Sequence, residues 1–486
     1  MNINDIVSKL WNLCHVLRDD GITYQEYVNE LSFLLFLKMM QETRQEGDLP
    51  EGYRWSDLES KDGVEQLAFY RALLVHLGNE GSDRVKGIFA NANTALRVPK
   101  SLAKLVQSID DIDWYQATSS DSDIADQKGD HLGDMYEGLL EKNASEKKSG
   151  AGQYFTPRPL IDSMIACIDP QPGEIIQDPA GGTAGFIIAA DRAIRRKTDN
   201  LFDLSLDEQK FQKSKAYHAV ELVPDTHRLL LMNCMLHNVS GNFICGDSMG
   251  SIGQKLPKAD VIVTNPPFGT KRGGGGPTRD DFTFETGNKQ LNFLQHIYRA
   301  LKPGGRAAVV LPDNVLFEEG TGSRIRADLM DKCNLHTILR LPTGIFYAQG
   351  VKTNVLFFTR GKTDTGNTKQ VWVYDLRANM PAFGKRTPLT REHFSEFQTC
   401  YGTKSDGSSQ RKDEGEEGRF RVFNRDQIAA RGDNLDISWL KDDNATAASD
   451  LLPPEEIAGM IRERLTTAME EMDALAELLE CDEVGR

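Results

Sequence analysis

The chain has 486 residues, 39% of them hydrophobic and 27% charged, and carries a formal net charge of −15 at pH 7. No apolar run approaches the roughly 20 residues that cross a bilayer, and the polar start lacks the pattern of a signal peptide, so we expect a cytoplasmic protein without a membrane partner. This negative net charge also argues against a surface that holds nucleic acid by bulk electrostatics alone, because clustered Lys and Arg residues are needed to neutralise the phosphates.

The first part of the chain predicts an N-terminal helical domain over residues 1–150. From Ile3 to about residue 115 the apolar residues recur with helical spacing, and few turn residues interrupt the segments. The polar segment 117–127 is typical of a linker, a further helix is expected from about His131 to Lys142, and the run 147–152 is typical of a flexible junction. Because the chain is too long for one ordinary core, a second domain is expected to follow.

Residues 151–400 predict that second domain, of the α/β class. Short β-rich runs alternate with helical stretches, and such alternation implies crossover connections and a doubly wound, mainly parallel sheet. Ligands of such sheets bind beyond the carboxyl ends of the strands. The expected strands cover residues 174–178, 216–221, 242–245, 260–264, 306–311, 335–341 and 354–359.

The last part of the chain predicts two different kinds of structure. Residues 401–452 predict an irregular segment, in which the polar run 403–418 is expected to be a disordered loop. Residues 453–486 predict a C-terminal helix to about Glu480, because its apolar residues follow a heptad spacing. Packing on its own chain and docking on another subunit both fit this pattern. The heptad positions are Ile461, Leu465, Ala468, Met472, Leu475 and Leu479.

A glycine-rich turn follows the first expected strand, which ends at Asp178. Residues 179–186 lead directly into a helix, so the glycines allow a ligand to lie against bare backbone while the helix N-terminus offers free amide donors. The turn matches neither a phosphate-binding P-loop nor Gly-x-Gly-x-x-Gly, which disfavours a triphosphate or a dinucleotide. We therefore expect a different nucleotide-like cofactor at this turn, with Asp178 at its start as a candidate contact.

Two carboxylates follow the next two strands. Glu221 ends the second strand, where a carboxylate can accept hydrogen bonds from both hydroxyls of a ribose. Asp247 follows the third strand and is a candidate acceptor for the amino group of a cofactor adenine, although an ordinary turn aspartate explains it equally well.

The most specific motif is Asn265-Pro266-Pro267-Phe268, directly after the fourth strand. Two prolines fix φ and remove amide donors, which makes a stiff turn with outward carbonyls. The side-chain oxygen of Asn265 and the carbonyl of Pro266 can then both accept hydrogen bonds from one amino group, and Phe268 can stack on a planar base. A turn that is merely stiffened by proline is the structural alternative.

Together these motifs resemble the modification subunits of type I restriction-modification systems. The resemblance rests on residues 178–186, 265–268, 152–160 and the Leu-Pro-Asp-Asn segment 311–314, and it extends over most of the chain. It implies a Rossmann-like methyltransferase that uses S-adenosylmethionine to methylate adenine in DNA. By the same resemblance, residues 265–268 are the catalytic motif, Thr183 to Gly185 and Glu221 contact the cofactor, and so do Gln153, Tyr154, Phe155, Thr156, Pro157 and Arg158.

The resemblance also implies an assembly. In the family a specificity subunit binds two modification subunits, which fits an acidic chain with little sequence left for a DNA-recognition domain after residue 268. Duplex DNA and a specificity subunit are therefore the expected partners, and the sequence leaves open whether a restriction subunit joins them. A duplex base must be flipped out of the stack before its amino group can react.

Three alternatives compete with this interpretation. A methyltransferase of an RNA base or of a protein glutamine would use the same motifs, because each substrate presents a planar amine; a degenerate, non-enzymatic scaffold is disfavoured because every expected motif is intact. No cysteine nucleophile and no metal is expected, since none of the seven cysteines follows a proline and the nine histidines form no evident cluster. The glycine-rich run 269–276 is either a flexible loop or a lid that orders on DNA.

Overall fold

The protein is described here from a computed structural model, whose described residues are 3–18, 21–112, 114, 131–146, 155–268, 279–346, 351–381, 383–384 and 387–440. The expected linker 117–127, the junction 147–152, the glycine-rich run 269–276 and the C-terminal helix 453–486 lie outside these residues. So do Gln153 and Tyr154, two of the expected cofactor contacts. Within the described residues, no helix is long and apolar enough to cross a membrane.

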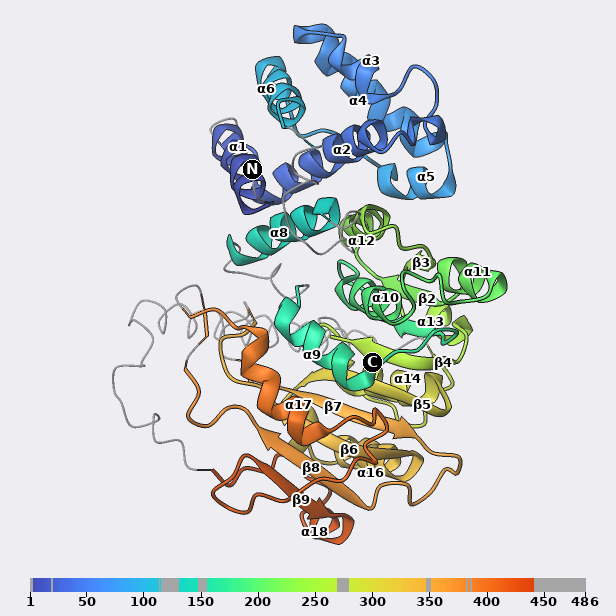
Figure 1. Ribbon diagram of the computed structural model, residues 1–486, viewed down its shortest axis with the longest axis vertical. Helices are drawn as coiled ribbons and strands as arrows, with labels where there is room; N and C mark the ends of the chain where they lie inside the picture. Colours follow the sequence, from blue (N-terminus) through green and yellow to red (C-terminus); the bar gives the residue numbers. More distant parts are fainter. Residues whose placement is uncertain are drawn as a thin grey trace, which may run out of the picture.

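A helical domain forms the upper part of the molecule (Figure 1). Its second helix begins with a capping box, in which Thr23 Oγ1 accepts from the Glu26 amide at 3.3 Å and Glu26 Oε2 accepts from the Thr23 amide at 2.8 Å. The apolar stretch 31–37 of that helix is buried throughout. The helices are α1 (Ile3–Arg18), α2 (Tyr24–Glu42), α3 (Trp55–Glu59), α4 (Gly63–Asn79), α5 (Asp83–Phe89), α6 (Pro99–Asp110) and α8 (His131–Glu146), with a 3-10 turn at Glu46–Asp48.

The second domain is built on one nine-stranded sheet in the order β3-β2-β1-β4-β5-β7-β6-β8-β9. Strands β3, β2, β1, β4 and β5 pair in parallel, whereas β7 is antiparallel to both β5 and β6. The expectation of a doubly wound, mainly parallel sheet is confirmed. The strands are β1 (Ile176–Asp178), β2 (Tyr217–Glu221), β3 (Asn242–Cys245), β4 (Ala259–Thr264), β5 (Leu301–Pro312), β6 (Cys333–Arg340), β7 (Thr353–Arg360), β8 (Gln370–Asp375) and β9 (Phe420–Asn424).

The sheet continues past residue 400, contrary to the expected irregular segment 401–452. Strand β9 pairs with β8, and the run 403–418 between them is held in place, so the expectation of disorder was wrong. Arg411 explains the difference: its guanidinium donates to Thr337 Oγ1 at 2.9 Å and to the His336 carbonyl at 3.2 Å, and it lies 4.9 Å from the centre of the Tyr401 ring. One half-buried cation thus anchors a run whose polar composition is typical of disorder.

Helices cover both faces of the sheet. One hydrophobic cluster packs α9, α10 and α17 against one face, and another packs α14 and α16 against the other. The helices of this domain are α9 (Arg158–Ile168), α10 (Gly185–Lys197), α11 (Leu206–Ser214), α12 (Pro224–Leu236), α13 (Ser251–Lys255), α14 (Lys289–Ala300), α15 (Asn314–Phe317), α16 (Thr321–Lys332), α17 (Ser395–Tyr401) and α18 (Arg425–Ala429), with a 3-10 turn at Arg391–Phe394.

Helix α12 joins the two domains. In Figure 1 it lies, with α8, between the remaining helices of the helical domain and the sheet. Its residues Leu229, Met232 and Leu236 belong to the hydrophobic core of the helical domain. The buried Arg228 donates from Nε to the Ile88 carbonyl at 2.7 Å and from its guanidinium to the Ala90 carbonyl at 2.9 Å, at the carboxyl end of α5. The interface is therefore an apolar core with a buried cation on otherwise unsatisfied helix carbonyls.

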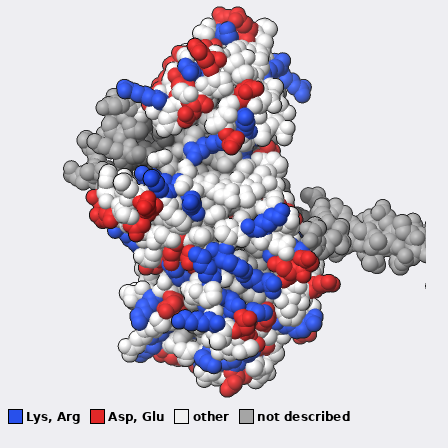
Figure 2. All heavy atoms as spheres, turned by 90° about the vertical axis from the view of Figure 1, so that its right-hand side faces the viewer, with Lys and Arg blue, Asp and Glu red and all other residues white. Residues whose placement is uncertain are grey.

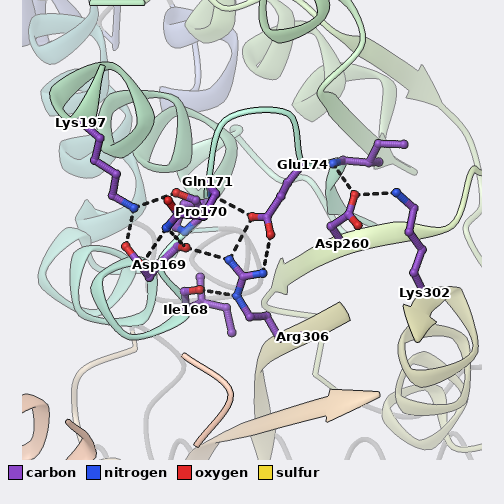
Figure 3. A network of polar contacts seen from close by, with 10 residues as sticks. Ile168, Asp169, Pro170, Gln171, Glu174, Lys197, Asp260, Lys302 and Arg306 are labelled. Atoms are coloured by element: carbon purple, nitrogen blue, oxygen red, sulfur yellow. Dashed lines mark hydrogen bonds and ion pairs between the residues drawn. The ribbon is translucent and has the colours of Figure 1, made fainter. Parts of the chain in front are cut away.

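The amino edge of the sheet is held by a polar network around Arg306 (Figure 3). The Arg306 guanidinium forms two hydrogen bonds with the Glu174 carboxylate, at 2.6 and 2.9 Å, and donates to the carbonyls of Ile168 and Asp169 at 2.6 and 2.7 Å. It thereby ties β5 to the end of α9 and to the segment before β1. The nearby Lys302 forms a single, more exposed ion pair with Asp260.

We predict that Arg306→Ala lowers the free energy of unfolding by about 3 kcal/mol, because it leaves a carboxylate and two helix carbonyls without their donor. The matched control Lys302→Ala should cost at most about 1 kcal/mol, since its ion pair is more exposed. Urea unfolding followed by circular dichroism compares the two variants. Equal stability of Arg306→Ala and the parent protein would contradict this account of the edge.

Candidate active site

A cavity of about 560 Å³ opens at the carboxyl edge of the parallel strands. It lies where the strand order reverses, with β1 between β2 and β4, which is the position at which doubly wound sheets bind ligands. Residues after β1, β2, β3 and β4 border it, and helix α8 of the helical domain forms part of the wall. The expected position of the ligand site is therefore matched by a cavity.

The glycine turn is packed tightly against β2. A Cβ atom at Gly181 would lie 2.8 Å from Leu230 Cδ1 and 3.2 Å from Ala219 Cβ, so any larger residue there would force these neighbours to shift. Gly182 has φ +52, a conformation that favours glycine. The turn therefore brings bare backbone to the cavity wall, as expected for a cofactor loop.

Glu221 fixes this turn to the end of β2. One carboxylate oxygen accepts from the Gly182 amide and the other from the Val223 amide, each at 2.9 Å. The side chain is buried yet borders the cavity, and burial raises the pKa of its carboxyl. Each oxygen keeps a second lone pair for another donor, so Glu221 can hold the turn and accept from a ligand hydroxyl.

Three of the expected contacts at the turn border the cavity and one does not. Asp178, Thr183 and Gly185 lie on the wall. Asp178 is fully enclosed, which raises the pKa of its carboxyl to about 7, and it accepts from the Ala180 amide at 3.1 Å. Ala184 caps the start of α10 with φ +68, is completely buried, and is absent from the wall.

Asp247 also borders the cavity, at the end of β3. One of its oxygens accepts from the Met249 amide at 2.8 Å, the geometry of a turn aspartate. The side chain is exposed. Its hydrogen bond therefore fits a turn aspartate, and its position on the wall fits a cofactor contact.

The described part of the segment 153–158 lies beside the cavity. Phe155, Thr156 and Arg158 border it, whereas Pro157 caps the start of α9 and does not. Arg158 forms an ion pair with Glu137 on α8. This segment therefore connects the wall of the cavity with the helical domain.

The Asn-Pro-Pro-Phe turn follows β4 at the same edge. Asn265 and Pro267 border the cavity, whereas Pro266 is buried beside it. Asn265 donates from Nδ2 to Thr156 Oγ1 at 3.0 Å, and its Oδ1 has no hydrogen-bond partner among the described residues. The side chain of Gln290 donates to the Pro267 carbonyl at 3.0 Å and so braces the turn.

Phe268 does not face the cavity in this structure. Its ring packs edge-on against Phe346, with ring centres 5.7 Å apart and planes at 89°. It is only half-buried, and the chain after it lies outside the described residues. The expected stacking surface is thus next to the site but not on its wall.

The sequence did not predict two groups of residues on the wall. One comes from α8, whose acidic side chains reach the wall from the helical domain, a placement that no local pattern indicates. The other comes from the start of α14, where Asn288 caps the helix by accepting from two backbone amides. These residues are Asp134, Glu137, Gly138 and Glu141 on α8, and Gly287, Lys289, Asn292 and Phe293 around the start of α14.

The acidic residues of α8 belong to an ion-pair cluster. Asp134, Glu137 and His237 bring their ligand atoms within 4.8 Å of one another, which is the donor set of a metal site. Arginines occupy it instead: Arg192 pairs with Asp134 and lies 3.2 Å from His237 Nδ1, and Arg158 pairs with Glu137. The cluster therefore links α8 to α9, α10 and α12 by charge.

Two family models match most of the chain. Residues 127–447 match the family model N-6 DNA Methylase, and residues 6–112 match the HsdM N-terminal domain. The chain is 53% identical over 511 aligned positions to the type I restriction enzyme StySPI methylase subunit of Salmonella potsdam, covering 98% of this chain and 95% of that one. It is 52% identical to the EcoKI methylase subunit of Escherichia coli K12, with the same coverage.

Solved structures agree as well. The crystal structure of the EcoKI M protein matches with 47% identity and a TM-score of 0.58, covering 98% of this chain and 96% of that one. A structure concerned with complex assembly and conformational transition of the type I R-M system matches with 27% identity and a TM-score of 0.71, covering 98% of both chains. The chain therefore belongs to the N-6 DNA methylases that form the methylase subunits of type I restriction enzymes, and it is an adenine-specific DNA methyltransferase.

Proposed function

We propose that the cavity binds S-adenosylmethionine and that Asn265 receives the amino group of an adenine flipped out of duplex DNA. The observation that carries this proposal is the amide of Asn265: its nitrogen is held by Thr156, and its oxygen faces no partner among the described residues, at the wall of the cavity. A buried acceptor without a donor is costly, so it implies a donor that arrives with the substrate.

The cavity suits the cofactor. About 560 Å³ lies in the range of small-molecule sites, and the Glu221 carboxylate offers acceptors for ribose hydroxyls beside the bare backbone of the glycine turn. The carboxyl groups of Asp178 and Glu221 also border the cavity, and a cationic sulfonium ligand beside them favours their ionised forms. S-adenosylmethionine, when bound, supplies the activated methyl group.

The chain's own residues would activate the amine. The amino nitrogen of adenine is a poor nucleophile while its lone pair is delocalised into the ring of the base. Asn265 Oδ1 and the Pro266 carbonyl accept its two hydrogens, which favours pyramidal geometry and stabilises the positive charge that develops on the nitrogen. Gln290 holds the neighbouring Pro267 carbonyl and keeps the turn rigid, and Phe268 offers a ring on which the flipped base stacks.

We further propose that the chain acts in the cytoplasm with a specificity subunit and a second copy of itself. The relatives are named as subunits of type I restriction enzymes, and one matched structure concerns the complex assembly of such a system. Because the chain is acidic overall, we expect the partner to supply the Lys and Arg side chains that bind the DNA phosphates. Whether a restriction subunit completes the complex is a separate question for copurification.

Asn265→Ala is predicted to lower methyl transfer at least about a hundredfold, because it removes an acceptor that acts on the developing charge. Binding of S-adenosylmethionine, measured by calorimetry, should stay within a few-fold of the parent protein. The assay is radiolabelled methyl transfer to duplex DNA in the presence of the specificity subunit. Transfer within tenfold of the parent would refute the role of Asn265.

Thr156→Val is predicted to slow transfer about tenfold, because it frees the Asn265 amide to rotate. Thr156→Ser keeps the acceptor oxygen and should restore the rate. The resemblance makes Thr156 a cofactor contact, whereas this geometry makes it a positioning residue for Asn265. A Thr156→Val variant that binds S-adenosylmethionine at least tenfold more weakly, with kcat unchanged, would favour the cofactor contact alone.

Deleting residues 453–486 is predicted to abolish copurification with the specificity subunit, because their heptad pattern suits a helix that docks on another chain. The truncated chain should still bind S-adenosylmethionine, since the described site lies before residue 300. Gel filtration and methylation assays of both chains, with and without the partner, test this. Robust site-specific methylation by the isolated full-length chain would contradict the need for a partner.

A further inference from the structure

A second cavity, of about 280 Å³, lies at the amino edge of the sheet, opposite the active site. Lys258 precedes β4, Arg299 lies near the end of α14 before β5, and Lys332 ends α16 before β6. Arg360 ends the antiparallel strand β7 and so reaches the same edge. Figure 2 shows basic side chains gathered over the lower half of this face, although the whole chain is acidic.

The cations around this cavity are only partly compensated. Arg279 forms two hydrogen bonds with Asp281, at 2.6 and 2.7 Å, and Arg360 pairs with Asp364. Arg299 lies 3.9 Å from the already engaged Asp281.

Lys258 makes no ion pair within the described residues; its ammonium donates to the Arg299 carbonyl. Of the five basic residues on the lining, Arg279, Arg360 and Lys332 are paired with aspartates, so Lys258 and Arg299 carry the excess positive charge.

The electrostatics around Lys258 favour an anion beside it. Burial lowers the pKa of its ammonium, and the positive charges of Arg299, Arg279 and Arg360 lower it further, against the opposite effect of Asp281. These are the charged groups that face it from α14, from the segment before α14 and from β7. A bound anion would reverse this repulsion.

His296 adds a hydrogen-bond donor beside the cavity. It is 1% exposed, and its Nδ1 lies 2.7 Å from the Arg279 guanidinium, which can only donate. Burial lowers the pKa of the imidazole to about 3, so the ring is neutral and its proton sits on Nε2. That N–H has no acceptor among the described residues. Buried groups of this kind are rare and call for a ligand or an ion.

We propose that this cavity binds the phosphate group of a small molecule, either inorganic phosphate or a nucleotide. Its lining offers an ammonium and guanidinium groups converging on one space, which suits a compact oxyanion. A duplex would instead require an open stripe of cations along a surface. Lys258 and Arg299 are the expected primary contacts, because they are the least compensated by carboxylates.

The test uses the full-length chain and three variants. Binding of inorganic phosphate and of a nucleoside triphosphate is measured by calorimetry at constant ionic strength. Lys258→Gln and the double variant with Arg299→Gln remove the proposed contacts. Lys302→Gln is the matched control, since Lys302 begins β5 at the same edge but does not line the cavity.

We expect saturable binding of phosphate or of the nucleotide that weakens at least tenfold in Lys258→Gln and is unchanged in Lys302→Gln. Tighter binding of one of the two probes identifies the source of the phosphate group. Methylation with the specificity subunit should be unaffected by Lys258→Gln. Absence of saturable binding, or an equal loss in the control, would each overturn the proposal.

Discussion

The parallel pairing of β1 with β2 on one side and with β4 on the other is the constraint on which the rest of the site depends. Ile176 is in register with Tyr217 of β2 and with Val261 of β4, so the three strands end at the same edge. The residues that directly follow these strands therefore lie close together at that edge. The glycine turn follows β1, Glu221 ends β2 and Asn265 follows β4, which places backbone donors, a carboxylate and an amide around one cavity without any long-range contact being specified separately.

The helical domain completes this arrangement as a wall of the cavity. Its core extends onto α12 of the catalytic domain, and Arg228 fixes the contact from within. Helix α8 then contributes Glu137, which pairs with Arg158 at the start of α9. The segment that carries Thr156 is thereby held between the two domains, so the orientation of the Asn265 amide depends on how the helical domain docks.

The sequence predicted the parallel part of the sheet because each buried strand is a short β-rich run bounded by turn residues, and all seven expected strands are present. It did not predict β8 and β9, because a long polar insertion separates these two paired strands in the chain. Arg411 anchors that insertion, and amino-acid composition alone does not predict such a contact. Of the expected site residues in the described part of the chain, most of those at strand ends lie on the cavity wall. Pro157 and Pro266 lie beside it. Ala184 is buried by a left-handed cap, and the ring of Phe268 packs edge-on against Phe346.

The carboxyl and amino edges of the sheet differ in charge, and this difference affects how the enzyme can bind DNA. Six acidic and two basic side chains border the catalytic cavity. Two of the acidic ones, on α8, are paired with Arg158 and Arg192, so the cavity offers little positive charge to the phosphates of a duplex. The basic side chains gather instead at the amino edge, on the far side of the sheet. The cavity itself therefore offers few cations to hold a duplex, which supports the proposal that a specificity subunit supplies them together with sequence recognition.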